Sequence, residues 1–248
     1  MTQLIRTELL KLSTIRTFKG LIAGSVAFTL LRFAMVVSSA GRIESSPLGT
    51  AASTQSLMLA AGSGTILFLV VGVLIVVTEY RHGTIGLTFL ATPRRGMVVA
   101  AKVAAAAIVA LAYLLAISVL VLGLIVALFR SRNIPLDAIN GELLALMGGV
   151  VIAMPLYAVM GVGLGALIRH HVAALMIPLA WFLIVETLLP SFGLTPILTW
   201  LPGGATAALA RSNISGLLPM WGGALLLVFY AAATSALGGW VLARRDVT

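Results

Sequence analysis

Few residues of this chain could do chemistry by themselves. The 248 residues include no cysteine, which excludes disulfides, thiolate catalysis and cysteine-based metal sites. The three histidines are His82, His170 and His171. Side chains of adjacent helical residues diverge by about 100°, and no acid or third histidine lies near His170 and His171, so we expect no metal there. The sequence G-x-x-x-x-G-K-[ST] is missing, so we expect no P-loop, no bound cofactor and no enzyme activity on this chain.

The densest group of polar residues lies in the stretch 79–102, EYRHGTIGLTFLATPRRGMVVAAK. It begins with a charged cluster that includes Glu79 and Arg81, and it contains a turn around Pro93. One interpretation is a topogenic loop whose basic residues only follow the charge asymmetry of membrane proteins. The other is a short amphipathic helix, closed by Pro93, that anchors apolar residues at the membrane surface and presents charges to a soluble partner.

Composition places this stretch in an integral membrane protein. Hydrophobic residues make up 60% of the chain and charged residues only 9%, and the mean hydropathy is +1.14. A net charge of +9 would suggest nucleic acid in a soluble domain. Here no separate basic domain exists to contact phosphates, so we expect no nucleic-acid partner and a lipid bilayer instead.

The apolar pattern predicts an all-α integral membrane protein in which residues 1–248 form one transmembrane domain. Residues 1–19 have apolar residues at helical spacing beside several basic ones, which is typical of an amphipathic helix in the membrane interface. The proline- and glycine-rich segment 190–218 is expected to be an extracytoplasmic re-entrant or interfacial segment. The six expected spans are 20–39, 57–78, 102–129, 141–168, 172–189 and 220–242, with 79–101 as a loop between the second and the third.

The distribution of basic residues predicts the orientation. Six spans place both termini on one side, and eleven of the 16 Lys and Arg residues fall on that side. The positive-inside rule therefore places both termini and the 79–101 loop in the cytosol.

Three charged residues lie where apolar surroundings are expected. Glu8 projects into the apolar arc of its helix, so it either reaches water at the rim or meets a basic group on this chain or a partner. Arg32 lies thirteen residues beyond Lys19, and Glu186 lies fifteen beyond His171. At 1.5 Å per residue, both are roughly 20 Å above the cytosolic edge. They either pair or face one polar cavity, or each reaches the surface independently.

Nine positions in and beside the loop form an ordered pattern: Glu79, Arg81, Gly83, Thr84, Thr88, Thr92, Pro93, Arg94 or Arg95, and Lys102. This pattern resembles the first cytosolic loop of bacterial ABC-type exporter permeases of the ABC type 2 membrane family. Further features along nearly the full chain agree with that family: Glu8-Leu9-Leu10-Lys11, Trp200-Leu201-Pro202-Gly203-Gly204 and Arg244-Arg245-Asp246.

The resemblance implies a permease subunit of an ATP-driven exporter in the bacterial inner membrane. It implies a second permease, identical or homologous, and two copies of a separate P-loop ATPase that binds ATP and Mg²⁺. The 79–101 loop would be the coupling helix. The residues expected to couple the ATPase to the membrane domain are Glu79, Arg81, Gly83, Thr84, Arg94, Arg95, Glu8 and Lys11.

Two other functions stay open from the residues. An ion-coupled secondary transporter would use an acid near the bilayer midplane, for which Glu186 is the lone candidate, and no internal repeat is evident. A non-transport membrane assembly protein or enzyme is the third, although no catalytic constellation is present. Few polar residues face the predicted bundle, which favours a lipid, hydrophobic drug or peptide as substrate over a small ion.

Overall fold

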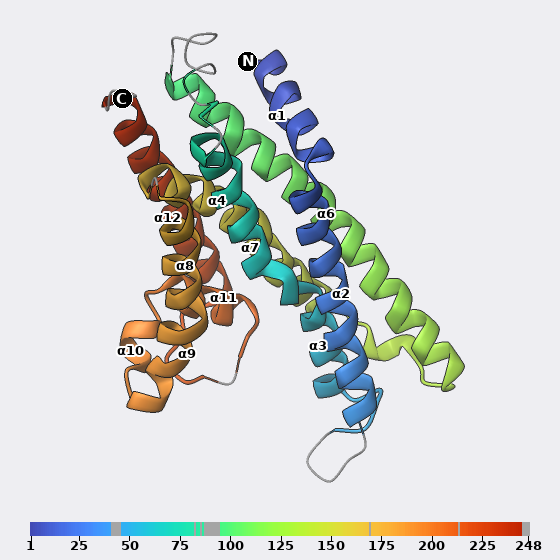
Figure 1. Ribbon diagram of the computed structural model, residues 1–248. Helices are drawn as coiled ribbons and strands as arrows, with labels where there is room; N and C mark the ends of the chain where they lie inside the picture. Colours follow the sequence, from blue (N-terminus) through green and yellow to red (C-terminus); the bar gives the residue numbers. More distant parts are fainter. Residues whose placement is uncertain are drawn as a thin grey trace.

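The computed structural model describes residues 1–40, 46–81, 83–84, 86, 95–168, 170–212 and 214–244. These residues form helices and turns, and no strand is found among them (Figure 1). Six helices are long and apolar enough to cross a membrane. They cover Arg16–Ser39, Ala51–Arg81, Gly96–Ser131, Gly141–Leu167, His171–Phe192 and Met220–Leu242. The all-α, multi-pass architecture predicted from hydropathy is therefore confirmed.

Shorter elements make up several of these spans. A helix α1 (Thr2–Thr14) precedes the first span, α2 (Arg16–Ser39). The second span consists of α3 (Ala51–Leu59), the 3-10 turn η1 (Ala60–Gly64) and α4 (Thr65–Arg81). The third and fourth spans are α6 (Arg95–Ser131) and α7 (Gly141–Leu167), joined through η2 (Leu136–Ala138).

The last third of the chain is the most interrupted. The fifth span consists of α8 (His171–Ala180), the π-helical turn η3 (Trp181–Val185), α9 (Glu186–Leu188) and η4 (Leu189–Phe192). Two short helices, α10 (Thr195–Leu198) and α11 (Pro202–Leu209), lead to the sixth span, α12 (Met220–Arg244).

Helix α6 is longer than the span predicted from the sequence. It has 37 residues, which is about 55 Å at 1.5 Å per residue, whereas the hydrocarbon core of a bilayer is about 30 Å thick. It begins at Arg95, inside the segment expected to be a loop. Residues 97–110 are rich in alanine and valine and contain no proline, so nothing in the sequence ends the helix there.

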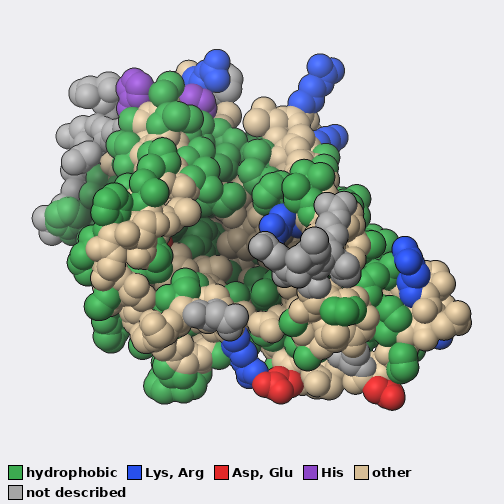
Figure 2. Space-filling view, turned by 90° about the horizontal axis from the view of Figure 1, so that it is seen from below, with side chains coloured by type: hydrophobic (Ala, Val, Ile, Leu, Met, Phe, Trp, Pro, Cys, Tyr) green, Lys and Arg blue, Asp and Glu red, His purple; other side chains and the backbone are tan. Residues whose placement is uncertain are grey.

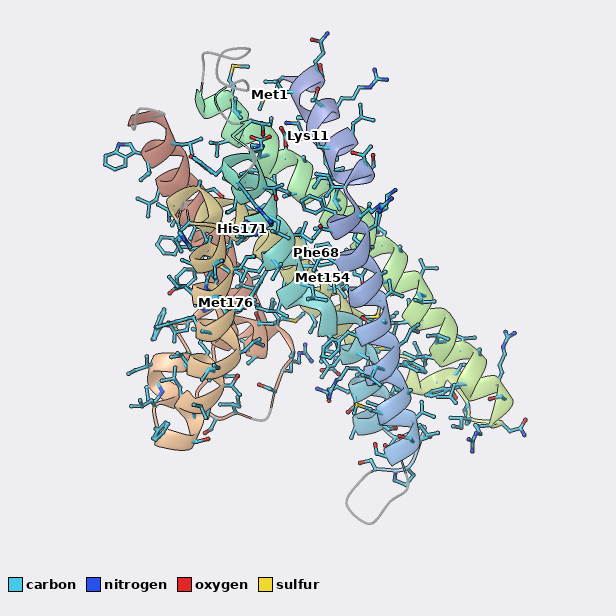
Figure 3. All side chains as sticks on the ribbon, viewed as in Figure 1. Met1, Lys11, Phe68, Met154, His171 and Met176 are labelled. Atoms are coloured by element: carbon cyan, nitrogen blue, oxygen red, sulfur yellow. The ribbon has the colours of Figure 1, made fainter. Side chains whose placement is uncertain are left out.

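The centre of the bundle is the contact between α4 and α7. Phe68 of α4 and Met154 of α7 are buried there (Figure 3). Glycines permit the close approach of the two backbones. A Cβ added at Gly72 would overlap the carbonyl oxygen of Ala158, and one added at Gly161 would overlap that of Leu69. The small residues are therefore required for packing within one chain.

Both chain ends lie at the same end of the bundle, the upper end in Figure 1. The end of α4 and the start of α6 lie there too. This is the arrangement that the predicted topology requires, while the cytosolic side of this end stays a prediction. Ile15 has extended backbone angles that interrupt the N-terminal helix, and α1 packs against α6. Figure 1 shows α1 continuing obliquely from α2, so its in-plane interfacial position also stays a prediction.

Helix α11 turns back into the bundle, where it packs on α12 and α7. Five of its residues are buried: Pro202, Gly204, Ala205, Ala208 and Leu209. A Cβ added at Gly223 of α12 would lie 2.6 Å from the carbonyl oxygen of Ala205, so the two helices are in close contact. Whether residues 190–218 are a re-entrant or an interfacial segment stays a prediction. Figure 2, seen from the lower end, shows a hollow in the middle of this face.

Candidate functional site

Four charged side chains meet at the upper end of the bundle. Lys11 Nζ lies 2.9 Å from Glu8 Oε1 and 2.7 Å from Glu79 Oε1. Lys102 Nζ lies 3.0 Å from Glu8 Oε2 and 2.8 Å from Glu79 Oε1. Each lysine thus contacts both carboxylates and each carboxylate contacts both lysines. We call this set the four-charge ring; it joins α1, α4 and α6.

The ring is largely removed from water. The Lys102 side chain is 2% exposed and those of Glu8 and Glu79 are below 10%, whereas the Lys11 side chain is 40% exposed. Two positive and two negative groups balance, which is what allows these charges to be buried. Removing one member would leave an uncompensated buried charge, at a cost of about 3–5 kcal/mol.

The pKa of Lys11 reflects this arrangement. Partial burial by itself lowers the pKa of the ammonium, because it disfavours the charged form. The hydrogen bonds to Glu79 and Glu8 and the charges of both carboxylates together outweigh burial, so the pKa of Lys11 is raised above its ordinary value. Lys11 is therefore protonated throughout the physiological pH range.

A cavity of about 30 Å³ lies beside the ring, lined by Glu8, Lys11, Glu79 and apolar side chains. Glu79 Oε2 is buried and has no hydrogen-bond partner among the described residues. The cavity is large enough for one water molecule, which could donate a hydrogen bond to this oxygen.

The end of α4 fixes the position of Glu79. The N–H of Thr84 donates to the carbonyl oxygen of Glu79 at 3.0 Å, and the N–H of Gly83 donates to that of Tyr80 at 3.2 Å. With Gly83 at φ +66°, this is a Schellman cap, in which glycine occupies the left-handed position. Helix termination therefore explains why glycine stands at position 83.

The residues expected to contact an ATPase are placed differently from one another. Arg81, Gly83 and Thr84 are exposed at the upper end. Glu8 and Glu79 are buried in the ring, so the expectation that Glu79 presents its charge to a soluble partner does not agree with its position. Of the basic pair in the loop, one is Arg95, the first residue of α6, and the other, Arg94, lies outside the described residues.

Of the two alternatives for Glu8, the meeting with basic groups of the same chain is the one found. Lys102 belongs to the family pattern but is not among the site residues expected from the sequence. The signal was available: it is a lysine inside an alanine- and valine-rich helix, where an unpaired charge would be costly.

The two intramembrane charges do not meet. Arg32 is exposed on α2, and no ion pair joins it to Glu186, although both residues are described. Glu186 is buried: its Oε1 accepts from Trp181 Nε1 at 2.7 Å, and its Oε2 accepts from the N–H of Gly203 at 2.5 Å. The pairing allowed by their matched depths is therefore not found: Arg32 is on an exposed face, and the partners of the buried Glu186 are Trp181 and Gly203.

The histidines have no metal-site geometry in the described part of the chain. His170 Nδ1 accepts from the N–H of Ala173 at 3.3 Å and caps α8. His171 is the first residue of α8, and Figure 3 shows it below Met1 and Lys11. No group of three or more His, Cys, Asp or Glu side chains that could hold a metal occurs among the described residues.

No protein-family model matches the sequence, and no curated protein matches it either. The resemblance to ABC type 2 permeases therefore rests on the residues of this chain.

Proposed function

We propose that this chain is the membrane-spanning permease subunit of an ATP-driven exporter of the ABC type 2 kind, in a bacterial cell membrane. The observation that carries the proposal is the four-charge ring, which joins both ends of the α4–α6 connection to α1. The six spans and the order of residues from Glu79 to Lys102 support it. ATP and Mg²⁺ would be bound by two copies of a separate P-loop ATPase, acting on a pair of permeases.

If an ATPase displaces the α4–α6 connection, the movement must be transmitted to the helices on both sides of it. Glu79 lies in the last turn of α4, and Lys102 lies near the start of α6. Because both contact α1 as well, a displaced connection would move the three helices together instead of bending one of them. Separating the helices would leave buried charges without their partners, so movement of the three helices as one body is favoured.

Helix α6 gives this movement a route across the membrane. It is one continuous helix of 37 residues, and it packs against α7 and α12. A displacement of its upper end would therefore change the packing of α6 on these two spans. Such a change is what a substrate path between helices needs in order to open.

The exposed residues next to the connection are the surface that a partner would contact. Arg81 and Thr84 are both exposed there, and Lys11 is the ring member with the most exposed side chain. Glu8, Glu79 and Lys102 would act behind this surface, by holding the helices that carry it.

The secondary-transporter alternative would depend on Glu186. Its two oxygens accept hydrogen bonds from Trp181 and Gly203, which gives the carboxylate a role in fixing a helix. A coupling acid must exchange protons or ions with water during transport. No observation favours a non-transport assembly protein.

The proposal is tested by purification under native conditions followed by an ATPase assay. We expect a P-loop ATPase to copurify and its activity to be stimulated by the permease. Arg81→Glu should lower the stimulated activity by about tenfold, since it reverses a charge at the contact surface, and should leave membrane insertion intact. The matched control is Arg132→Glu, an exposed arginine beyond the lower end of α6, which should have no effect. Absence of a P-loop ATPase, or full stimulation by Arg81→Glu, would contradict the proposal.

A further inference from the structure

The beginning of α11 is held by a carboxylate from another helix. The N-cap of α11 is Leu201, whose side chain cannot accept a hydrogen bond. Glu186 replaces it, because its Oε2 accepts from the N–H of Gly203 in the first turn. A Cβ at Gly203 would overlap that oxygen, so this approach requires glycine.

The end of α11 is held by an ion pair to a distant helix. Arg211 follows α11 and contacts Glu142 in the first turn of α7. The N–H of Ser212 donates to the carbonyl oxygen of Ala207 at 3.1 Å, and the N–H of Arg211 donates to that of Ala208 at 3.1 Å. Arg211 has φ +46°, so it occupies the left-handed position of a Schellman cap.

The same cap position is filled by different residues at two helix ends. At the end of α4 it is Gly83, the residue that adopts a left-handed backbone without strain. At the end of α11 it is Arg211, for which this backbone is strained. The pair with Glu142 is exposed, with 45% of the Arg211 side chain and 69% of the Glu142 side chain accessible. An exposed ion pair contributes little to the free energy of folding. It therefore does not offset the strained backbone of Arg211, and stability alone does not account for an arginine at this position.

Two glycines bound the region that contains α10 and α11. Gly193 has φ +71° and Gly216 has φ +85°, and a Cβ at either would meet nothing within 4 Å. Both glycines are therefore explained by their left-handed backbone and not by close packing. Each also makes a hydrogen bond: the N–H of Gly193 donates to the carbonyl oxygen of Pro190, and the carbonyl oxygen of Gly216 accepts from Thr199 Oγ1. A cavity of about 300 Å³ lies beside the ion pair and is lined by Gln55 and Asn140 as well as by Glu142 and Arg211. Water at the lower end thus reaches the pair.

We infer that α11 is a hinged helix at the lower end of the bundle, and that the Glu142–Arg211 pair holds its far end against α7 in addition to its buried packing. Opening of the pair lets α11 separate from α7, where Tyr157 and Thr206 are hydrogen-bonded at 3.1 Å. Glu186 holds the other end of α11, so the movement is a rotation about its beginning. The hinge movement requires no ATPase, so its test is independent of the proposed transport function.

The experiment uses the cysteine-free chain, in which one introduced cysteine is the only thiol. Ala205→Cys places it on α11 at a position that is 0% exposed. The probe is a membrane-impermeant maleimide applied to the lower side in membrane vesicles. Adding Arg211→Gly removes the ion pair but supplies the better cap residue. We expect labelling of the thiol introduced on α11 to become about fivefold faster in this background. The charge exchange Glu142→Arg with Arg211→Glu should restore slow labelling.

The two possible roles of Arg211 predict opposite signs. If Arg211 only caps α11, Arg211→Gly relieves strain and labelling stays the same or slows, which would overturn the inference. The control is Thr54→Cys on α3, a helix at the lower end in Figure 1, where Thr54 is also 0% exposed. If this position labels faster as well, the whole bundle has loosened and the inference fails. If the Ala205→Cys protein is not recovered, Ala208→Cys, which is 4% exposed on the same helix, gives the same test.

Discussion

The four-charge ring at the upper end and the Glu142–Arg211 pair at the lower end both join helices that are far apart in the sequence, but they differ in burial. Lys102 in the ring is 2% exposed, whereas the carboxylate side chain of the lower pair is 69% exposed. Buried charges are costly to separate and exposed ones are not. The upper end is therefore suited to move as one body, and the lower end is suited to open.

The largest effect should come from breaking the ring. Lys102→Met leaves two buried carboxylates opposite one lysine, so we expect the free energy of unfolding to fall by about 3–5 kcal/mol. Chemical unfolding in detergent, followed by tryptophan fluorescence, measures it. Lys19→Met removes an exposed lysine of α2 and should change the value by less than about 0.5 kcal/mol. Equal effects of the two substitutions would show that the ring is not a buried network.

A smaller effect is expected at the cap that holds Glu79 in place. Gly83→Ala forces a left-handed backbone on alanine and should destabilise the protein by about 1–2 kcal/mol. Gly96→Ala is the matched control, because Gly96 lies in α6, has no left-handed backbone and has free space for a Cβ. It should be neutral or stabilise by about 0.4–1 kcal/mol. The same unfolding assay compares them, and a neutral Gly83→Ala would contradict the cap.

The exposed pair should contribute still less. Glu142→Gln keeps the shape of the side chain and removes its charge, so we expect the free energy of unfolding to fall by about 0.2–1 kcal/mol at low salt. The difference from the unchanged protein should vanish in about 1 M salt, where exposed charges are screened. If Glu142→Gln lowered the free energy of unfolding as much as Lys102→Met, the charges at the two ends would be held equally strongly, which would contradict the comparison.

The smallest effect concerns pH. Because the pKa of Lys11 is raised in the folded protein, its contribution to stability is fully present below its ordinary value of 10.5 and is lost as pH rises through the folded value. Thermal melting temperatures measured from about pH 9 to about pH 11 should therefore fall more steeply for the unchanged protein than for Lys11→Met. If the two curves were parallel, the contacts with Glu8 and Glu79 would not raise the pKa of Lys11 in the folded protein.

The sequence predicted the six spans because long apolar runs need no tertiary information to be recognised. It predicted less of the ring, for a physical reason. The position of Glu8 in the apolar arc allowed either contact with water at the rim or a basic partner, because periodicity gives only the face of one helix and not the helix that covers it. Lys102 lies 94 residues away from Glu8, so only the packing of α1 on α6 brings the two together.

Depth along a helix likewise does not determine whether Arg32 and Glu186 form a pair. Their matched heights allowed a pair, but height does not determine the direction in which each side chain points. The π-helical turn Trp181–Val185 directly precedes Glu186 and changes that direction. Gly83 belongs to the expected coupling pattern, but the hydrogen bonds of the local cap are enough to explain a glycine there.

Site-specific cross-linking from the α4–α6 connection tests the central claim most directly. Thr84→Cys places the only thiol of the chain at an exposed position beside the connection, and Ser131→Cys places it at the exposed lower end of α6. With a short thiol-reactive cross-linker in native membranes, we predict that Thr84→Cys gives an adduct with a P-loop ATPase, identified by mass spectrometry, and that Ser131→Cys gives none. An adduct of equal yield from both positions, or none from Thr84→Cys, would contradict the role assigned to this end of the molecule.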